Sequence, residues 1–233
     1  MLWRQQPAAG APRCLLLFVL VTMGMSSMEL VPYQPQLVEQ VKTIHVHDVE
    51  LRLVENYLGS SGTGGLIWST AIEFATFCHQ HIDWTNQRVL ELGSGTGVLG
   101  LLLLRFGAAN VTLTDQASIV PLLERNVALN GLKQRGASVK ELTWGSTSSA
   151  FLSDDEGRFD YIVGSDITYH PRLIPLLLDT LSAYTTPGQT RILLAHMDRY
   201  PARTRIFEAA AERRFHLERR LHNPPLTVYE LRK

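Results

Sequence analysis

The chain has 233 residues, 45% of them hydrophobic, and its 22 basic residues balance its 22 acidic ones. This length suffices for one hydrophobic core and leaves no room for a second full domain. A balanced charge provides no global field that would draw the protein onto nucleic acid, so we expect no nucleic-acid partner. Two cysteines are too few for a disulfide framework, which favours a reducing compartment, the cytoplasm and also the nucleus.

Residues 1–28 form a hydrophobic extension ahead of the expected domain at 29–233. Two arginines precede an apolar run from Cys14 to Met25, which is the layout of a secretory signal or short anchor. The run is shorter than the roughly 20 apolar residues of a transmembrane helix. A targeted or anchored form and an untargeted extension upstream of a second start at Met28 both fit, and membrane attachment is expected only through this segment.

The next part of the chain shows three patterns. The segment from Thr43 to His47 alternates polar and apolar residues, as a half-buried strand does. A glycine-rich loop follows at 59–65. Helical periodicity then runs from Ile67 to Ile82.

From Arg88 onwards, strand and helix patterns alternate, which is typical of parallel β-α units covered on both faces. The predicted strands are 88–92, 110–114, 138–144, 159–164 and 191–196, and the predicted helices are 98–106, 118–130, 171–183 and 202–214. We expect Ser118 to cap its helix and Gly131 to close it. Two last strands, 215–221 and 226–231, are joined by a short turn and must be antiparallel, because a parallel pair needs a crossover. The prediction is an α/β fold, a Rossmann-like, doubly wound seven-strand sheet with a terminal antiparallel hairpin.

A glycine-rich turn follows the first predicted strand of this α/β region. It reads Glu91-Leu92-Gly93-Ser94-Gly95-Thr96-Gly97, and glycines here let a ligand approach the backbone closely. Asp115 ends the next strand, where a carboxylate can accept hydrogen bonds from a ribose diol. Together the turn and Asp115 predict a nucleoside ligand at the carboxyl ends of these two strands.

Two cofactor classes share this arrangement. Gly95, Gly97 and Gly100 have a spacing related to the dinucleotide fingerprint, which keeps an NAD-dependent dehydrogenase as an alternative. Glu91 followed by Gly93 and Gly95 makes instead the Glu-x-Gly-x-Gly form typical of methyltransferases. A carboxylate at Glu91 would repel a pyrophosphate, whereas it can interact through water or backbone with the cationic amino-acid end of S-adenosylmethionine. The turn therefore favours S-adenosylmethionine.

The order of the motifs resembles the family-16 seven-β-strand methyltransferases, mostly protein-lysine methyltransferases that act on chaperones, AAA ATPases and elongation factors. The resemblance runs from about Gly65 to Lys233 and rests on Gly65-Leu66-Ile67-Trp68, the glycine turn, Asp115, Leu142-Thr143-Trp144-Gly145 and Asp166-Ile167-Thr168-Tyr169. Segment 139–145 looks similar to the branch that methylates seventy-kilodalton heat-shock chaperones and valosin-containing protein. The resemblance implies a S-adenosylmethionine-dependent protein-lysine N-methyltransferase, which we expect to be a monomer with a folded protein substrate.

The resemblance also implies which residues bind the methyl donor, and Glu91 joins them through the argument above. The implied residues are Trp68, Gly93, Ser94, Gly95, Asp115, Trp144 and Ser165. A tryptophan brings a large apolar face and one N–H donor, which suits adenine or the methionine part of the donor. Packing in the core for Trp68, and at the rim of the sheet for Trp144, are the structural alternatives.

Asp166 and Tyr169 are the candidate catalytic residues. In the family, this Asp-x-x-Tyr element lies beside the transferred methyl group and helps to hold the target amine. Methyl transfer is an in-line displacement, so catalysis rests on alignment and on a neutral nucleophile, and burial favours the neutral form of a lysine. We expect Asp166 to orient the incoming ammonium and Tyr169 to shape the channel or accept a hydrogen bond. The alternatives are helix capping at Pro171 for Asp166 and sheet-edge packing for Tyr169.

Other chemistries receive little support from the sequence. The histidines lack metal-ligand spacing, so no metal is expected, and no Gly-x-Ser-x-Gly turn is present. Methylation of histidine, arginine or a small amine remains open, as does a binding subunit without activity. An acidic groove leading to Asp166 would favour a lysine substrate, whereas a closed pocket would favour a small molecule.

Overall fold

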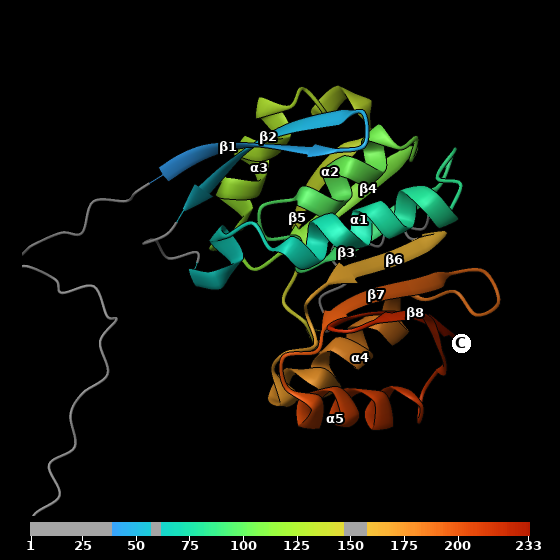
Figure 1. Cartoon of the computed structure of the whole chain (residues 1–233). Helices are drawn as coiled ribbons and strands as arrows, with labels where there is room; N and C mark the ends of the chain where they lie inside the picture. The colour runs from blue at the N-terminus through green and yellow to red at the C-terminus, as the bar shows by residue number, and fades with distance from the viewer. Residues whose placement is uncertain (1–38, 57–61, 147–157) are drawn as a thin grey trace, which may run out of the picture. The chain divides into compact units, whose positions relative to one another are not determined.

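The structure, a computed structural model, describes residues 39–56, 62–146 and 158–233 (Figure 1). Its strands are β1 (Glu39–Val46), β2 (Val49–Asn56), β3 (Arg88–Leu92), β4 (Asn110–Asp115), β5 (Ala137–Glu141), β6 (Tyr161–Ser165), β7 (Arg191–Met197), β8 (His216–Asn223) and β9 (Leu226–Arg232). Its α-helices are α1 (Ser69–His81), α2 (Val98–Arg105), α3 (Val120–Leu129), α4 (Ile174–Tyr184) and α5 (Pro201–Ala211), and its 3-10 helices are η1 (Gly62–Gly65), η2 (Lys133–Arg135) and η3 (Pro171–Leu173). The extension at 1–28 lies outside these residues. Within the described ranges, no helix combines the length and the apolar character needed to cross a membrane.

One sheet carries seven strands in the order β5-β4-β3-β6-β7-β9-β8. The first five of these pair in parallel, and β9 pairs antiparallel with both β7 and β8. This topology confirms the predicted doubly wound sheet with a terminal antiparallel hairpin. A separate hairpin of β1 and β2 precedes the sheet.

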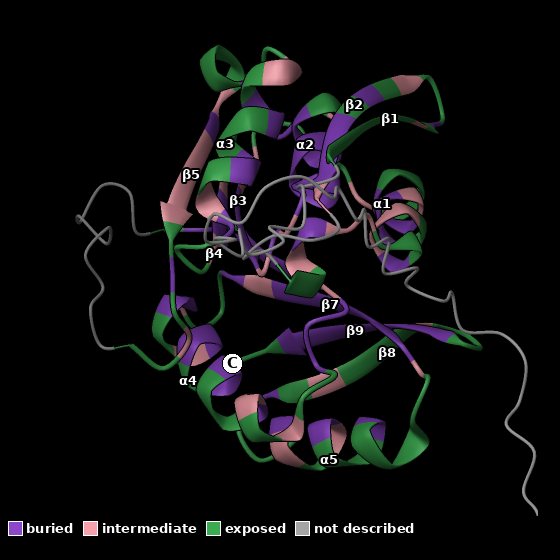
Figure 2. Ribbon diagram, turned by 90° about the vertical axis from the view of Figure 1, so that its left-hand side faces the viewer, coloured by how far each residue is buried: buried purple, intermediate pink, exposed green. Residues whose placement is uncertain are grey.

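Helices cover both faces of the sheet, and the alternation of strand side chains explains why. Val89 and Val163 face one hydrophobic core, which they share with α1, α2 and α3. Leu90 and Ile162, one residue away on the same strands, face a second core formed with α4 and α5. Successive side chains of a strand point to opposite faces, so a strand that is apolar at every position needs a helical layer on each side. Figure 2 shows the result, with β9 buried and the edge strand β8 largely exposed.

The sheet order also marks where a ligand can bind. Strands β3 and β6 are neighbours in the sheet. After β3 the chain adds β4 and β5 on one side of this pair, and after β6 it adds β7 on the other side. Ligands of doubly wound folds bind outside the carboxyl ends of the strands at such a reversal. The glycine turn follows β3 and the Asp166–Tyr169 segment follows β6, so both motifs lie at this point.

Three local predictions need correction. Ser118 does not cap its helix: α3 begins at Val120, its N-cap residue is Ile119, and no side chain caps it. The Gln116 carbonyl accepts the N–H groups of Ile119 and Val120, which supplies bonds that a cap would otherwise make. The predicted strand 138–144 ends at Glu141, and the predicted helix from Pro171 begins as η3 before α4. Gly131 does adopt the left-handed conformation (φ +63°) expected of a residue that closes a helix.

Candidate functional site

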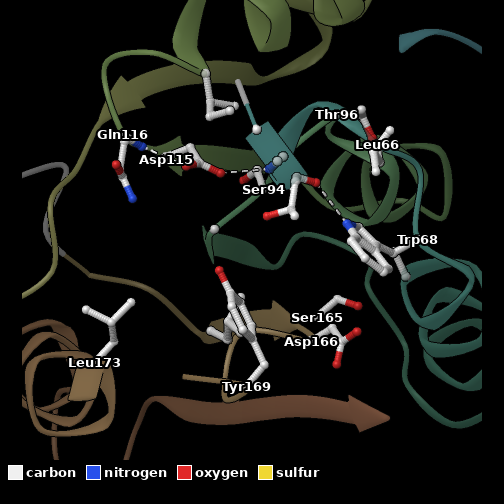
Figure 3. Close-up of a pocket in the computed structure, with 18 of the residues that line it drawn as sticks. Leu66, Trp68, Ser94, Thr96, Asp115, Gln116, Ser165, Asp166, Tyr169 and Leu173 are labelled. Carbon is white, nitrogen blue, oxygen red and sulfur yellow. Dashed lines mark hydrogen bonds between the residues drawn. The ribbon is translucent and has the colours of Figure 1, made fainter. Parts of the chain in front are cut away.

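A pocket of about 520 Å³ lies at the carboxyl ends of β3, β4 and β6 (Figure 3). Every residue that the sequence singled out lines this pocket: Trp68, Glu91, Gly93, Ser94, Gly95, Asp115, Trp144, Ser165, Asp166 and Tyr169. The structure therefore brings together five segments that are far apart in the sequence.

The glycine turn has a backbone conformation that side chains disfavour. Gly93 and Gly95 have φ angles of +64° and +55°, in the left-handed region that glycine adopts without steric cost. A Cβ atom on Gly95 would lie 2.9 Å from the carbonyl oxygen of Gly64, and one on Gly93 would lie 2.8 Å from the side chain of Ile167. The turn is thus in close contact with η1 on one side and with the segment after β6 on the other.

Hydrogen bonds fasten this turn to the end of β4. The Ser94 N–H donates to the Thr114 carbonyl at 3.0 Å, and the Thr114 N–H donates to Ser94 Oγ at 3.1 Å. Asp115 Oδ2 accepts the Gly95 N–H at 2.8 Å. Burial raises the pKa of Asp115, while the bonds from Gly95 and Gln116 oppose that rise. The carboxylate expected to bind a ribose therefore also positions the turn.

Glu91 lies beneath the turn and is only 2% exposed. Its Oε2 atom accepts the Gly100 N–H of α2 at 3.2 Å. Burial raises the pKa of Glu91 to about 8, against the lowering effect of hydrogen bonds from Ser94 and Gly100. Burial therefore favours the neutral form of this side chain in the absence of a cationic ligand.

Two tryptophans from different segments line the pocket. Trp68 precedes α1, donates its Nε1–H to the Thr63 carbonyl at 3.1 Å and keeps 39% of its surface exposed. Its exposure excludes core packing as its sole role. Trp144 lies in the loop after β5, where its Cζ2 atom would be 3.4 Å from a Cβ atom on Gly93.

Ser165 ends β6 and carries an unsatisfied hydroxyl. Among the residues that the structure describes, its Oγ is the buried side-chain atom without a hydrogen-bond partner. Buried polar atoms are nearly always bonded, and this one lines the pocket. A bound ligand that offers a polar group would satisfy it.

Asp166 follows Ser165 in a strained conformation. Its φ angle is +57°, and such values in non-glycine residues cluster at functional sites. The Asp166 N–H donates to the Ala195 carbonyl of β7 at 2.8 Å, which holds this conformation. The carboxylate faces the pocket, where Oδ2 lies 2.6 Å from Arg199 Nη1 and 3.3 Å from Thr70 Oγ1. It does not cap the helix at Pro171, because no side chain caps η3.

Tyr169 projects its hydroxyl into the pocket and is 46% exposed (Figure 3). Its backbone carbonyl accepts a hydrogen bond from Arg203 Nη1 at 3.2 Å. The Arg203 guanidinium stacks over the Tyr200 ring, 4.3 Å from the centroid. The exposure of Tyr169 excludes packing at the sheet edge as the sole role of this residue and leaves its phenol available to a ligand.

Sequence reasoning missed Arg199, Tyr200 and Arg203, which line the pocket next to Asp166. All three follow β7, which ends at Met197, so their position at the carboxyl end of a parallel strand was the signal that could have found them. The approach to Asp166 therefore carries two arginines. This approach therefore matches neither of the two predicted alternatives, an acidic groove for a lysine substrate or a closed pocket for a small molecule.

The pocket fits S-adenosylmethionine in four respects. The glycine turn exposes its backbone to a ligand, Asp115 offers a carboxylate for a ribose at the end of β4, and Ser165 Oγ needs a partner. The donor is cationic, and buried Glu91 can gain a favourable charge interaction with it by ionising. These features belong to one continuous pocket.

Comparison with known proteins gives the family. Residues 46–213 match the sequence profile of a family described as lysine methyltransferase. Protein N-lysine methyltransferase METTL21A of Danio rerio is 31% identical over 195 residues, covering 80% of this chain and 87% of the relative. EEF1A lysine methyltransferase 3 of Mus musculus is 31% identical over 170 residues, covering 72% of this chain and 71% of the relative.

A solved structure shares the fold. The 16S rRNA N2 G1207 methyltransferase RsmC of T. thermophilus, in complex with AdoMet and guanosine, aligns with a TM-score of 0.62 at 20% identity. The alignment covers 87% of this chain and 52% of the other. The family match decides against the dehydrogenase alternative. The chain belongs to the lysine methyltransferase family and takes S-adenosylmethionine as its methyl donor.

Proposed function

We propose that the chain transfers a methyl group to the Nζ atom of a lysine in a folded protein. The names of the relatives from Danio rerio and Mus musculus support a protein-lysine substrate. The observation that carries the proposal is the Asp166 carboxylate, which is buried in the pocket and binds a cationic side chain, that of Arg199. A carboxylate of this kind suits the ammonium group of a lysine.

The half of the pocket around the glycine turn is the proposed donor site. S-adenosylmethionine, when bound, supplies an electrophilic methyl group on a sulfonium sulfur. We assign Asp115 to the ribose hydroxyls and ionised Glu91 to the cationic amino-acid end. Backbone groups of the turn, the rings of Trp68 and Trp144, and the Ser165 hydroxyl complete the assignment; the proposed donor-binding set is Trp68, Glu91, Gly93, Ser94, Gly95, Asp115, Trp144 and Ser165.

The half of the pocket around Asp166 is the proposed amine site, bounded by Asp166, Trp68 and Tyr169. A lysine arrives as an ammonium ion and must lose one proton to solvent water before its lone pair can attack a methyl group. Asp166 would bind and orient the amine, and the Tyr169 hydroxyl would align it by a hydrogen bond. Alignment of this kind is the main contribution that a protein makes to an in-line displacement.

The catalytic domain, the oligomeric state and the cellular location can also be proposed. We propose that residues 29–233 form the catalytic domain and that the protein acts as a monomer in the cytoplasm, and also the nucleus. The equal numbers of basic and acidic residues support a protein partner over nucleic acid. Light scattering of the purified protein, and localisation with and without residues 1–28, test these points.

The test is a transfer assay with tritium-labelled S-adenosylmethionine, recombinant elongation factor 1A and a seventy-kilodalton heat-shock chaperone. We expect label on a lysine, located by mass spectrometry, and a loss of at least a hundredfold in rate for Asp166→Ala with donor affinity preserved. Asp160→Ala is the matched control, because Asp160 also accepts a backbone N–H, from Arg88 at 2.7 Å, but does not line the pocket. Label found only on histidine or arginine, or normal turnover by Asp166→Ala, would contradict the proposal.

A further inference from the structure

Arg199 occupies the amine site that the proposed function assigns to the target lysine. We propose that Arg199 is a specificity-determining residue: its guanidinium pairs with Asp166 until a lysine displaces it, and it then favours lysines that have a carboxylate side chain close by. This inference rests on the proposed function, because it concerns the same site.

The geometry places one cation where another must bind. Arg199 Nη1 lies 2.6 Å from Asp166 Oδ2, and the guanidinium carbon lies 5.3 Å from the centroid of the Trp68 ring. The remaining bonds to this carboxylate are long, at 3.3 Å from Thr70 Oγ1 to Oδ2 and 3.4 Å from the Met197 N–H to Oδ1. The short, charge-assisted bond to Arg199 is thus the one that a lysine ammonium would replace.

Displacement requires movement on only one side of the pair. The Arg199 side chain is 41% exposed, whereas that of Asp166 is 8% exposed. Arg199 lies between the end of β7 and the start of α5, so its side chain can swing out without breaking the sheet. Because the Arg199 side chain is partly in solvent, water already screens its charge and can hydrate it when it leaves, so a better-placed cation can replace it.

Among the described residues, Asp166 is the carboxylate that pairs with Arg199, so a displaced Arg199 loses this partner. Arg203 lines the same pocket, donates to the neutral carbonyl of Tyr169 and stacks on the Tyr200 ring. Once a lysine pairs with Asp166, we infer that the guanidinium groups of Arg199 and Arg203, which both line the pocket, become available to another carboxylate. Arginines pair well with carboxylates, and like charges across an interface are unfavourable. The favoured substrate is therefore a lysine with an aspartate or glutamate nearby, and a lysine among basic residues is disfavoured.

The displacement can be tested by binding, without turnover. The probe is n-butylammonium chloride, titrated into the S-adenosylhomocysteine complex and followed by the NMR signals of the Trp68 indole N–H and the Arg199 side chain. In the wild-type protein we expect the Arg199 signals to move towards those of a solvated arginine as the probe binds. Arg199→Gln should bind the probe at least fivefold more tightly, whereas Arg199→Lys, which keeps the competing charge, should change affinity less than twofold.

The outcomes separate the two proposals. Unchanged Arg199 signals at saturation, or no gain in affinity for Arg199→Gln, would overturn the displacement while leaving the amine site in place. Failure of the probe to bind even Arg199→Gln, or undiminished binding by Asp166→Asn, would instead overturn the amine site and with it the proposed function.

The preference for acidic neighbours is tested with two capped peptides, Gly-Glu-Gly-Lys-Gly-Glu-Gly and the same peptide with glutamines. We expect the glutamate peptide to bind the wild-type complex at least threefold more tightly, and we expect the double variant Arg199→Gln, Arg203→Gln to lose that preference. Equal affinities in the wild type, or no binding of the glutamate peptide at concentrations where butylammonium binds, would overturn this part of the inference.

Discussion

Asp115 Oδ2 lies 2.8 Å from the backbone nitrogen of Gly95, so the last residue of β4 positions the glycine turn that follows β3. The same carboxylate accepts the Gln116 N–H through Oδ1 at 2.7 Å. One side chain thus joins two adjacent strand ends at the place where a ribose is expected. Its loss should affect both the shape of the turn and the contacts with the donor.

Asp115→Ala should weaken binding of S-adenosylhomocysteine by about 1.5–3 kcal/mol, the usual contribution of hydrogen bonds to a charged group. That loss corresponds to roughly a tenfold to hundredfold rise in Kd and can be measured by isothermal titration calorimetry. Asp83→Ala is a suitable control, because Asp83 also accepts a backbone N–H, from Thr85, but does not line the pocket. Equal affinity of Asp115→Ala and the wild type would remove Asp115 from the donor site.

Ser165→Ala should separate stability from ligand binding. Because Ser165 Oγ is buried without a partner, its removal should leave the free energy of unfolding unchanged or raise it by up to about 1 kcal/mol. Binding of S-adenosylhomocysteine or of butylammonium should weaken, since the ligand loses its bond. Ser138→Ala is the counterpart: Ser138 Oγ bonds Thr112 Oγ1 at 3.1 Å outside the pocket, so this change should lower stability and spare binding. A clear loss of stability in Ser165→Ala would contradict the assignment.

Glu91 should make the ligand-free protein less stable as the pH rises. Its folded-state pKa of about 8 exceeds the unfolded value, so between about pH 4.5 and 8 the folded state binds the proton that the unfolded state has lost. The free energy of unfolding therefore falls across this window, by on the order of a few kcal/mol, and levels off above it. Urea denaturation at several pH values should show that the free energy of unfolding of Glu91→Gln decreases less with rising pH than that of the wild type. Parallel curves for the two proteins would show that Glu91 is ionised when folded.

His196 should destabilise the protein as the pH falls. Its ring is buried between Thr168 Oγ1 at 2.7 Å and Thr204 Oγ1 at 2.8 Å, and Thr204 in turn donates to Asp198. Burial lowers the pKa of His196, so below about pH 6.5 the unfolded state takes up a proton that the folded state does not. Stability present above pH 6.5 is lost as the pH drops from there towards the folded pKa.

The measurement for His196 is again the free energy of unfolding, compared with that of His196→Gln between pH 7 and pH 5. The wild-type protein should lose stability over this range relative to the variant. His45→Gln is a control, because the His45 side chain is exposed on β1 and is distant in sequence from His196. An identical pH dependence of the wild type and His196→Gln would show that the buried ring titrates normally.

The sequence by itself determined much of the local structure and which residues of the glycine turn and of the β4 end line the pocket. The boundaries of β3 were predicted to the residue, because a short apolar run ends there at a glycine turn whose positive φ angles only glycine tolerates well. The position of Asp115 beside the glycine turn could be predicted, because parallel strands end at one edge of a sheet and Asp115 ends the strand next to β3. The antiparallel pairing of β8 and β9 followed from the shortness of their connection.

Tertiary structure alone decided what surrounds Asp166 in the proposed amine site. Arg199 is 33 residues from Asp166, and their pairing depends on β6 and β7 being neighbours in register, which no local pattern encodes. The placement of β9 between β7 and β8, the left-handed conformation of Asp166 and the unsatisfied hydroxyl of Ser165 likewise arise from packing. Local patterns report hydrophobicity and turn chemistry, whereas the charge balance of a pocket depends on which distant side chains the sheet brings to one edge.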